Sequence, residues 1–218
     1  MNFSRARIFL AGLSVISLGI VLGTFLWLKL GPVPGRLGWD AKPLEGLNPY
    51  GAVPEFSLTE RSGKRITLAD LRGKIWVADF IYTTCKDTCP LQTAEMAKLQ
   101  EQWSDQSNLK LVSFSVDPDR DTPQVLTRYA ENFKADRDRW LFLTGDKEQI
   151  SHLVQAGFRL SAAPVTESGP EGQVVLHSPR FVLIDKETKI RGYYDSRDVE
   201  ALARLKKDIV TLMSGKKE

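Results

Sequence analysis

The stretch KIWVADFIYTTCKDTCP, residues 74–90, joins an apolar run to the chain's only two cysteines, Cys85 and Cys89. Its first part, KIWVADFIY, is rich in β-branched and aromatic residues, which predicts a buried strand. Pro90 follows the second cysteine and fits the first turn of a helix, because proline lacks an N–H and has a fixed φ. The stretch therefore predicts a strand, then a loop with two thiols, then a helix.

Strand-like and helix-like segments alternate on the C-terminal side of this stretch. We expect helices at 90–103, 122–133 and 146–158, strands at 109–116 and 139–144, a hairpin at 180–185 and 189–195, and a closing amphipathic helix at 198–213. This order predicts a mixed sheet with helices on both faces. A thioredoxin-like α/β fold matches it.

The N-terminal part carries an uncharged apolar run at 8–28, IFLAGLSVISLGIVLGTFLWL. About 20 apolar residues span a bilayer, and Arg5 and Arg7 before the run favour an N-terminus held in the cytoplasm. A cleaved signal peptide is the alternative, but its apolar region is usually about 7–15 residues long and ends in a small-residue cleavage site. The sequence therefore predicts a transmembrane helix that holds the folded part on the far side of a membrane.

Glycine and proline are frequent between residues 31 and 52, which indicates an extended linker. We therefore expect an N-terminus and anchor at 1–30, a linker at 31–52 and a folded domain at 53–218. The formal net charge of the 218 residues is +3, and no basic run is interleaved with aromatic residues. This composition argues against nucleic-acid binding.

The two thiols stand four residues apart, where a strand ends and a helix begins. A disulfide can form in an oxidising compartment, but a bond that closes so short a loop stabilises little. The helix N-terminus with Lys86 beside it lowers thiol pKa values, while Asp87 acts against this effect. Redox motifs are usually C-x-x-C, so the extra residue leaves room for a metal site. The simpler alternative is a pair of buried small side chains or an incidental disulfide.

A metal held by two thiolates needs at least one more ligand, and the chain has two histidines. His152 lies in a polar helical stretch, which is typical of a surface residue. His177 directly precedes a predicted strand and follows a Gly-, Pro- and Ser-rich segment at 161–173, and these residues alone leave a structural role and metal ligation open. Two thiolates and an imidazole suit Cu(I), tolerate Cu(II), and can hold Zn(II) with a fourth ligand.

The turn SVDPDRDTP (115–123) follows the strand predicted at 109–116. A turn-forming Asp-Pro pair and a helix cap explain most of its residues. Asp117 stands nearest the strand end, in the same sheet region as the cysteine loop. We therefore expect Asp117, rather than Asp119, to orient a ligand or carry charge near a metal.

Taken together, FIYTTCKDTCP, SFSVDPDRDTP and a histidine just before FVLID resemble the Sco/SenC family, the copper chaperones of cytochrome c oxidase assembly. The resemblance runs over residues 53–213. It implies a thioredoxin-like domain in which Cys85, Cys89 and His177 bind one copper ion, as Cu(I) or Cu(II). Asp117 matches the acidic residue of the family's D-P-x-R-D-T motif.

Two positions depart from the family pattern. Lys86 stands where such motifs often have proline, and a Ser178–Pro179 pair follows the histidine where threonine is more usual. Neither change removes a ligand, although both affect residues beside the ligands.

The resemblance implies a metallochaperone rather than an enzyme with turnover. Copper would pass to the dinuclear copper site of cytochrome c oxidase subunit II or to another copper-site protein, or the thiols would first reduce that subunit's cysteines. A thioredoxin-like reductant is a further candidate partner. The expected location is the inner (plasma) membrane, single-pass through residues 8–28, with the folded domain on the periplasmic or intermembrane-space side.

Two other functions compete with this one. A membrane-anchored thiol–disulfide oxidoreductase would use Cys85 and Cys89 as a redox pair without a required metal, and His177 would then be dispensable. A peroxidase of the peroxiredoxin type is disfavoured, because Tyr82 stands where a threonine precedes the attacking cysteine.

Overall fold

The computed structural model describes residues 47–160 and 178–215, which belong to one compact unit. The predicted anchor at 8–28, most of the predicted linker, and His177 lie outside these described residues. Within the two described ranges, no helix combines the length and the apolar character that crossing a membrane requires.

The described residues form a mixed eight-stranded sheet with the order β1-β8-β7-β4-β5-β6-β2-β3. The strands are β1 (Gly51–Ala52), β2 (Ser57–Glu60), β3 (Arg65–Thr67), β4 (Ile75–Ile81), β5 (Leu109–Ser115), β6 (Trp140–Thr144), β7 (Arg180–Ile184) and β8 (Lys189–Asp195). The three strands β4, β5 and β6 run parallel, and the other pairs are antiparallel. The carboxyl end of β4 therefore lies beside the amino end of β7.

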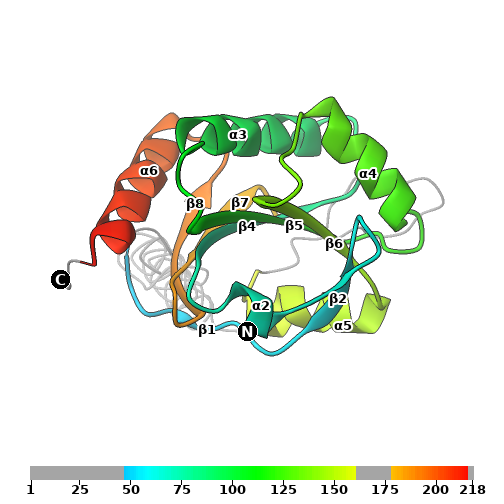
Figure 1. The fold of residues 1–218 in the computed structure, drawn as a ribbon, viewed down its shortest axis with the longest axis horizontal. Helices are drawn as coiled ribbons and strands as arrows, with labels where there is room; N and C mark the ends of the chain where they lie inside the picture. The colour runs from blue at the N-terminus through cyan, green and yellow to red at the C-terminus, as the bar shows by residue number, and fades with distance from the viewer. Residues whose placement is uncertain (1–46, 161–177, 216–218) are drawn as a thin grey trace, which may run out of the picture. The chain divides into compact units, whose positions relative to one another are not determined.

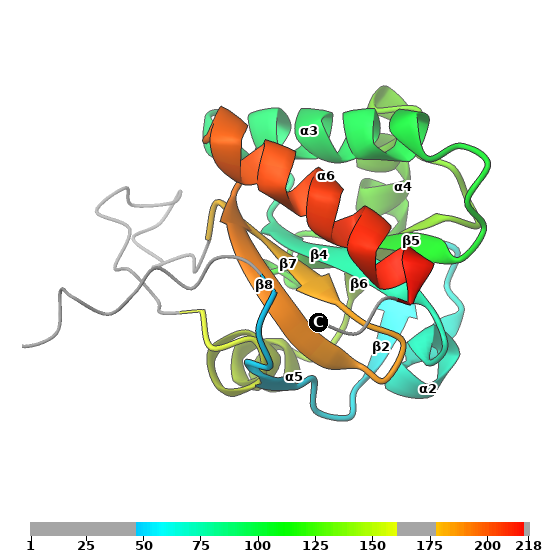
Figure 2. The ribbon, with the colours of Figure 1, turned by 90° about the vertical axis from the view of Figure 1, so that its left-hand side faces the viewer.

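Helices cover both faces of this sheet, with α3, α4 and α6 on one face and α2 and α5 on the other (Figures 1 and 2). They are α2 (Leu68–Leu71), α3 (Thr88–Gln102), α4 (Pro123–Asn132), α5 (Lys147–His152) and α6 (Val199–Ser214), and the π-helical turn η1 (Leu153–Gly157) continues α5. The predicted α/β order is confirmed.

Strand β4 lies at the centre of the sheet, and all of its residues are buried. Because successive side chains of a strand point to opposite faces, β4 supplies both cores. Val77 packs with Met96 on the α3 face. Trp76 and Phe80 pack on the other face, where the ring centroid of Phe80 lies 5.0 Å from that of Phe158. The polar Asp79 has the parity of Val77 and thus lies on the α3 face.

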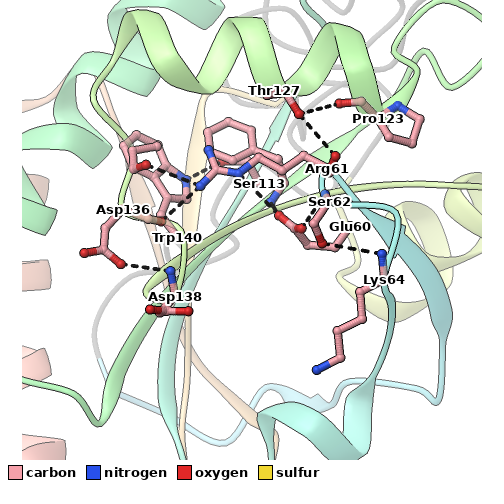
Figure 3. A network of polar contacts seen from close by, with 12 residues as sticks. Glu60, Arg61, Ser62, Lys64, Ser113, Pro123, Thr127, Asp136, Asp138 and Trp140 are labelled. Atoms are coloured by element: carbon pink, nitrogen blue, oxygen red, sulfur yellow. Dashed lines mark hydrogen bonds and ion pairs between the residues drawn. The ribbon is translucent and has the colours of Figure 1, made fainter.

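A polar network attaches the β2–β3 hairpin to α4 and to the segment before β6 (Figure 3). The backbone N–H of Ser62 donates to Glu60 Oε2 (2.7 Å), and the Arg61 guanidinium donates to the carbonyl of Asp136 (3.1 Å). The Thr127 hydroxyl of α4 donates to the carbonyl of Arg61 (3.1 Å). These bonds satisfy polar groups that the hairpin buries, as a compact fold requires.

The structure differs from the predicted pattern in three places. Helix α3 begins two residues before the predicted start, at Thr88, so that Cys89 lies inside its first turn. The predicted helix at 146–158 is divided into α5 and η1. The short elements β1, β2, β3 and α2 were not predicted, because two to four residues are too few for a periodic signal.

The sheet also includes described residues before residue 53. Backbone N–H groups of Asn48 and Tyr50 donate to carbonyls of β8 at 2.8 and 3.0 Å, and β1 pairs with the same strand. The last residues of the predicted linker therefore form an edge of the sheet.

Candidate thiol and metal site

Both cysteines lie at the carboxyl end of β4, in the loop and first turn that lead into α3. The Cys85 N–H donates to the carbonyl of Tyr82 (3.2 Å), and this turn points the thiol of Cys85 toward the start of α3. The Cys89 N–H then donates to Cys85 Sγ (3.4 Å). Both thiols are free, with 9% of Cys85 and 1% of Cys89 exposed. The α3 N-terminus thus brings the two thiols together.

The environments of the two thiols differ. Burial acts to raise the pKa of Cys85, but hydrogen bonds from the backbone N–H groups of Cys89 and Asp87 outweigh it, and the pKa lies below the ordinary value. Burial raises the pKa of Cys89 strongly, and the nearby charges of Cys85 and Asp79 add to this effect. Cys85 is therefore the more readily ionised thiol, and Cys89 favours its protonated form.

A buried carboxylate, Asp121, holds the loop that carries Cys85. Its Oδ2 accepts hydrogen bonds from the backbone N–H of Thr83 (3.1 Å) and from the Ser115 hydroxyl (2.6 Å), and its Oδ1 accepts from the Thr83 hydroxyl. Burial raises the pKa of Asp121, and these hydrogen bonds act in the opposite direction. The cysteine loop is thus attached to the end of β5.

Asp117, the predicted carboxylate, is also buried at the end of β5, with 4% of the residue exposed. Its backbone N–H donates to the Ser115 hydroxyl (3.1 Å), and its carboxylate accepts from Arg120 Nη1 (3.1 Å). In the described part of the chain it is Asp121, not Asp117, whose carboxylate bonds to the cysteine loop. The role predicted for Asp117 beside a metal stays a prediction.

A second buried carboxyl, Asp79, lies on the same face of β4 as the cysteines. Neither of its oxygens has a hydrogen-bond partner within normal geometry, although Ser113 stands beside it on β5. The Ser113 hydroxyl accepts from the indole N–H of Trp140 (2.9 Å). Burial raises the pKa of Asp79 to about 7. Asp79 was not predicted, although a single charged residue inside the apolar β4 is a signal for it.

The two histidines have different positions in the chain's architecture. His152 is exposed on α5, on the opposite face of the sheet from α3. His177 lies outside the described residues, but Ser178, the next residue, is held against α3: Gln92 Nε2 donates to the Ser178 carbonyl (3.4 Å). Gln92 stands three residues after Cys89. Within the described residues, no group of three or more His, Cys, Asp or Glu side chains could hold a metal.

A family model and a known relative both match this chain. The SCO1/SenC family model matches residues 46–214. The SCO1 protein homolog of Bacillus subtilis is 34% identical over 145 residues, which are 66% of this chain and 73% of the relative.

Two solved structures have the same fold. The structure of BsSco, described as a member of the Sco family of cytochrome c oxidase assembly proteins with a disulfide switch, has 30% identity and a TM-score of 0.64, and the match covers 80% of this chain and 97% of that one. The copper-bound ScoI of Bradyrhizobium japonicum has 27% identity and a TM-score of 0.56, covering 72% and 99%. These likenesses confirm the predicted thioredoxin-like α/β fold, and with the family match they show that the chain belongs to the SCO1/SenC family.

Proposed function

We propose that this chain binds one copper ion through Cys85, Cys89 and His177 and serves the assembly of cytochrome c oxidase. The observation that carries the proposal is the pair of free thiols at the start of α3, one of them with a lowered pKa, in a SCO1/SenC chain. The contact between Gln92 and Ser178 supports the third ligand, because it anchors the residue next to His177 close to the cysteines.

The donor set fits copper better than harder metals. Two thiolates and one imidazole are soft or borderline ligands, which Cu(I) prefers and Cu(II) accepts. Copper is the cargo of the protein here and has to leave again. Because Cys89 is buried and protonated, binding must release its proton, so the affinity for copper rises with pH.

The family's relatives support the cellular setting that we propose. One is named a member of the cytochrome c oxidase assembly proteins, and another binds copper. We propose that the cargo goes to the dinuclear copper site of oxidase subunit II, and that residues 8–28 anchor the domain to the membrane. An oxidised Cys85–Cys89 pair offers no thiolates, so reduction of the pair by a thioredoxin-like reductant must precede loading.

An anaerobic titration of the full-length, reduced protein with Cu(I) against a competing chelator tests this proposal. We expect one copper per chain for the wild type, and loss of competition for Cys85→Ser and for Cys89→Ser. If the double variant Cys85→Ser/Cys89→Ser competes as well as the wild type, the proposed function is wrong.

The asymmetry of the two thiols favours one second candidate, a thiol–disulfide reductase. A more acidic thiol that attacks and a more deeply buried thiol that resolves the mixed disulfide are what exchange chemistry needs. Reduction of an oxidised two-cysteine peptide by the metal-free protein tests it. The reductase requires both cysteines and retains its rate in His177→Ala, whereas copper binding requires the histidine.

A further inference from the structure

We propose that Asp121 is a positioning residue for the working thiols: its buried carboxylate clamps Thr83, two residues before Cys85, to the end of β5. The inference deepens the proposed function and rests on Cys85 and Cys89 being the working pair. Thr83 offers two donors to this carboxylate, its backbone N–H and its hydroxyl, and Ser115 offers a third.

The carboxylate itself is held in place. The Asp121 N–H donates to the carbonyl of Asp117 (2.9 Å), and the Arg120 N–H donates to the same carbonyl (3.1 Å). Asp121 is fully buried. A carboxylate buried away from water is tolerated when hydrogen bonds replace its hydration, and three donors do so here. The clamp is therefore built on a rigid turn and not on a mobile side chain.

Capping of α4 does not explain this carboxylate. The N-cap of α4 is Thr122, whose hydroxyl accepts from the Val125 N–H (3.4 Å). Asp121 precedes the cap, and its oxygens face the other way, toward the cysteine loop. Its bonds join segments 38 residues apart in the chain, Thr83 and Asp121. The residue thus serves the loop rather than its own helix.

The clamp complements the bonds inside the loop. The hydrogen bonds from Cys85 N–H to Tyr82 and from Cys89 N–H to Cys85 Sγ set the shape of the turn, but both lie within residues 82–89. The bond from Thr83 to Asp121 ties this turn to a second strand of the sheet. Without it, the two thiols spend less time at the separation that a disulfide or a shared metal ion needs, so their effective concentration falls.

The equilibrium between the dithiol and the disulfide measures this effect without copper. In a glutathione buffer the two thiols give two electrons and two protons to oxidised glutathione, which yields the Cys85–Cys89 disulfide and two reduced glutathione molecules. We expect Asp121→Asn and Thr83→Val each to lower the equilibrium constant of disulfide formation about tenfold, which corresponds to a potential roughly 30 mV less negative.

The variants separate position from charge. Thr83→Val removes the hydroxyl bond and keeps the charge of Asp121, whereas Thr83→Ser keeps both donors and should stay within about threefold of the wild type. If Asp121→Asn fails to fold, Thr83→Val alone decides. The inference is overturned if Thr83→Val leaves the constant unchanged, or if only Asp121→Asn changes it, since the effect would then be one of charge.

The experiment also distinguishes this inference from the proposed function. The thiol equilibrium needs no metal. A wild-type protein that binds no copper would therefore contradict the copper proposal, while the thiol equilibrium would still test the role of Asp121. Conversely, wild-type thiol equilibria in all three variants would contradict the role proposed for Asp121. They would not affect the outcome of the copper titration.

Discussion

Cys85 and Cys89 are four residues apart, but their pKa values are shifted in opposite directions. Cys85 accepts hydrogen bonds from the backbone at the start of α3, and Cys89 is packed into the core with 1% of the residue exposed. The local sequence predicted lowered thiol pKa values through the helix N-terminus, which agrees with the direction for Cys85 and is wrong for Cys89. That distinction depends on burial, which long-range packing decides.

A first prediction concerns the reactivity of these thiols. In the reduced protein, Cys85 alone, in Cys89→Ser, should react with iodoacetamide at least on the order of ten times faster at pH 7 than Cys89 alone, in Cys85→Ser. Mass spectrometry of the alkylated protein over time measures both rates. Equal rates, or faster modification of Cys89, would contradict the environments described for the two thiols.

A second prediction concerns Asp79, whose pKa is raised to about 7 by burial. An unfolded chain releases this proton near pH 4, so the free energy of unfolding falls as pH rises from about 4 to about 7. Asp79→Asn removes the free-energy cost of keeping an ionisable carboxyl buried. Relative to the wild type, the variant should gain about 2–3 kcal/mol more at pH 8 than at pH 5.

Urea unfolding of the reduced protein at the two pH values measures this difference. The exposed Asp105→Asn provides the matched control and should show no such pH dependence. A constant difference between Asp79→Asn and the wild type at both pH values would show that the carboxyl is ionised in the folded state.

The structure differs from the sequence-based prediction at Asp121, whose carboxylate bonds to the cysteine loop. The sequence assigns the end of the turn at 115–123 to a helix cap and favours Asp117 over Asp119, because Asp117 stands nearest the strand end. The strand end was correctly located, but the direction of a side chain in a turn depends on hydrogen bonds with Thr83, which is distant in sequence. No local pattern records such a bond.

At the level of elements, the long periodic segments were predictable and the short ones were not. β4, α3, β5, α4, β6, the β7–β8 hairpin and α6 all occur close to their predicted bounds. The hairpin of β2 and β3 is held by Glu60 and Arg61 through the network of Figure 3, and its strands have too few residues for a pattern. Tertiary contacts rather than local propensity determine these elements.

A third prediction concerns the start of α4. Thr122 is confirmed as its N-cap, so Thr122→Ala should lower the free energy of unfolding by about 1 kcal/mol. Thr122→Ser keeps an oxygen that accepts from Val125 and serves as the control. Chemical denaturation measures both variants, and an alanine variant as stable as the serine variant would contradict a capping role.

On the scale of the whole molecule, the sheet topology explains how residues distant in sequence can form one site. β4 and β7 pair antiparallel, with Ala78 opposite Val182, so the loop that follows β4 lies beside Ser178, which precedes β7. The bond from Gln92 of α3 holds Ser178 there. His177 lies just before the segment that was predicted as strand β7, and it is one of only two histidines in the sequence.

We propose that His177 completes a copper site with the two cysteines. The direct measurement is the visible absorption spectrum and chelator-competition affinity of the full-length Cu(II) protein, compared among wild type, His177→Ala and the control His152→Ala. We expect thiolate-to-copper charge-transfer bands in the wild type and in His152→Ala, and their loss or shift with weakened affinity in His177→Ala. An unchanged spectrum and affinity in His177→Ala would contradict it.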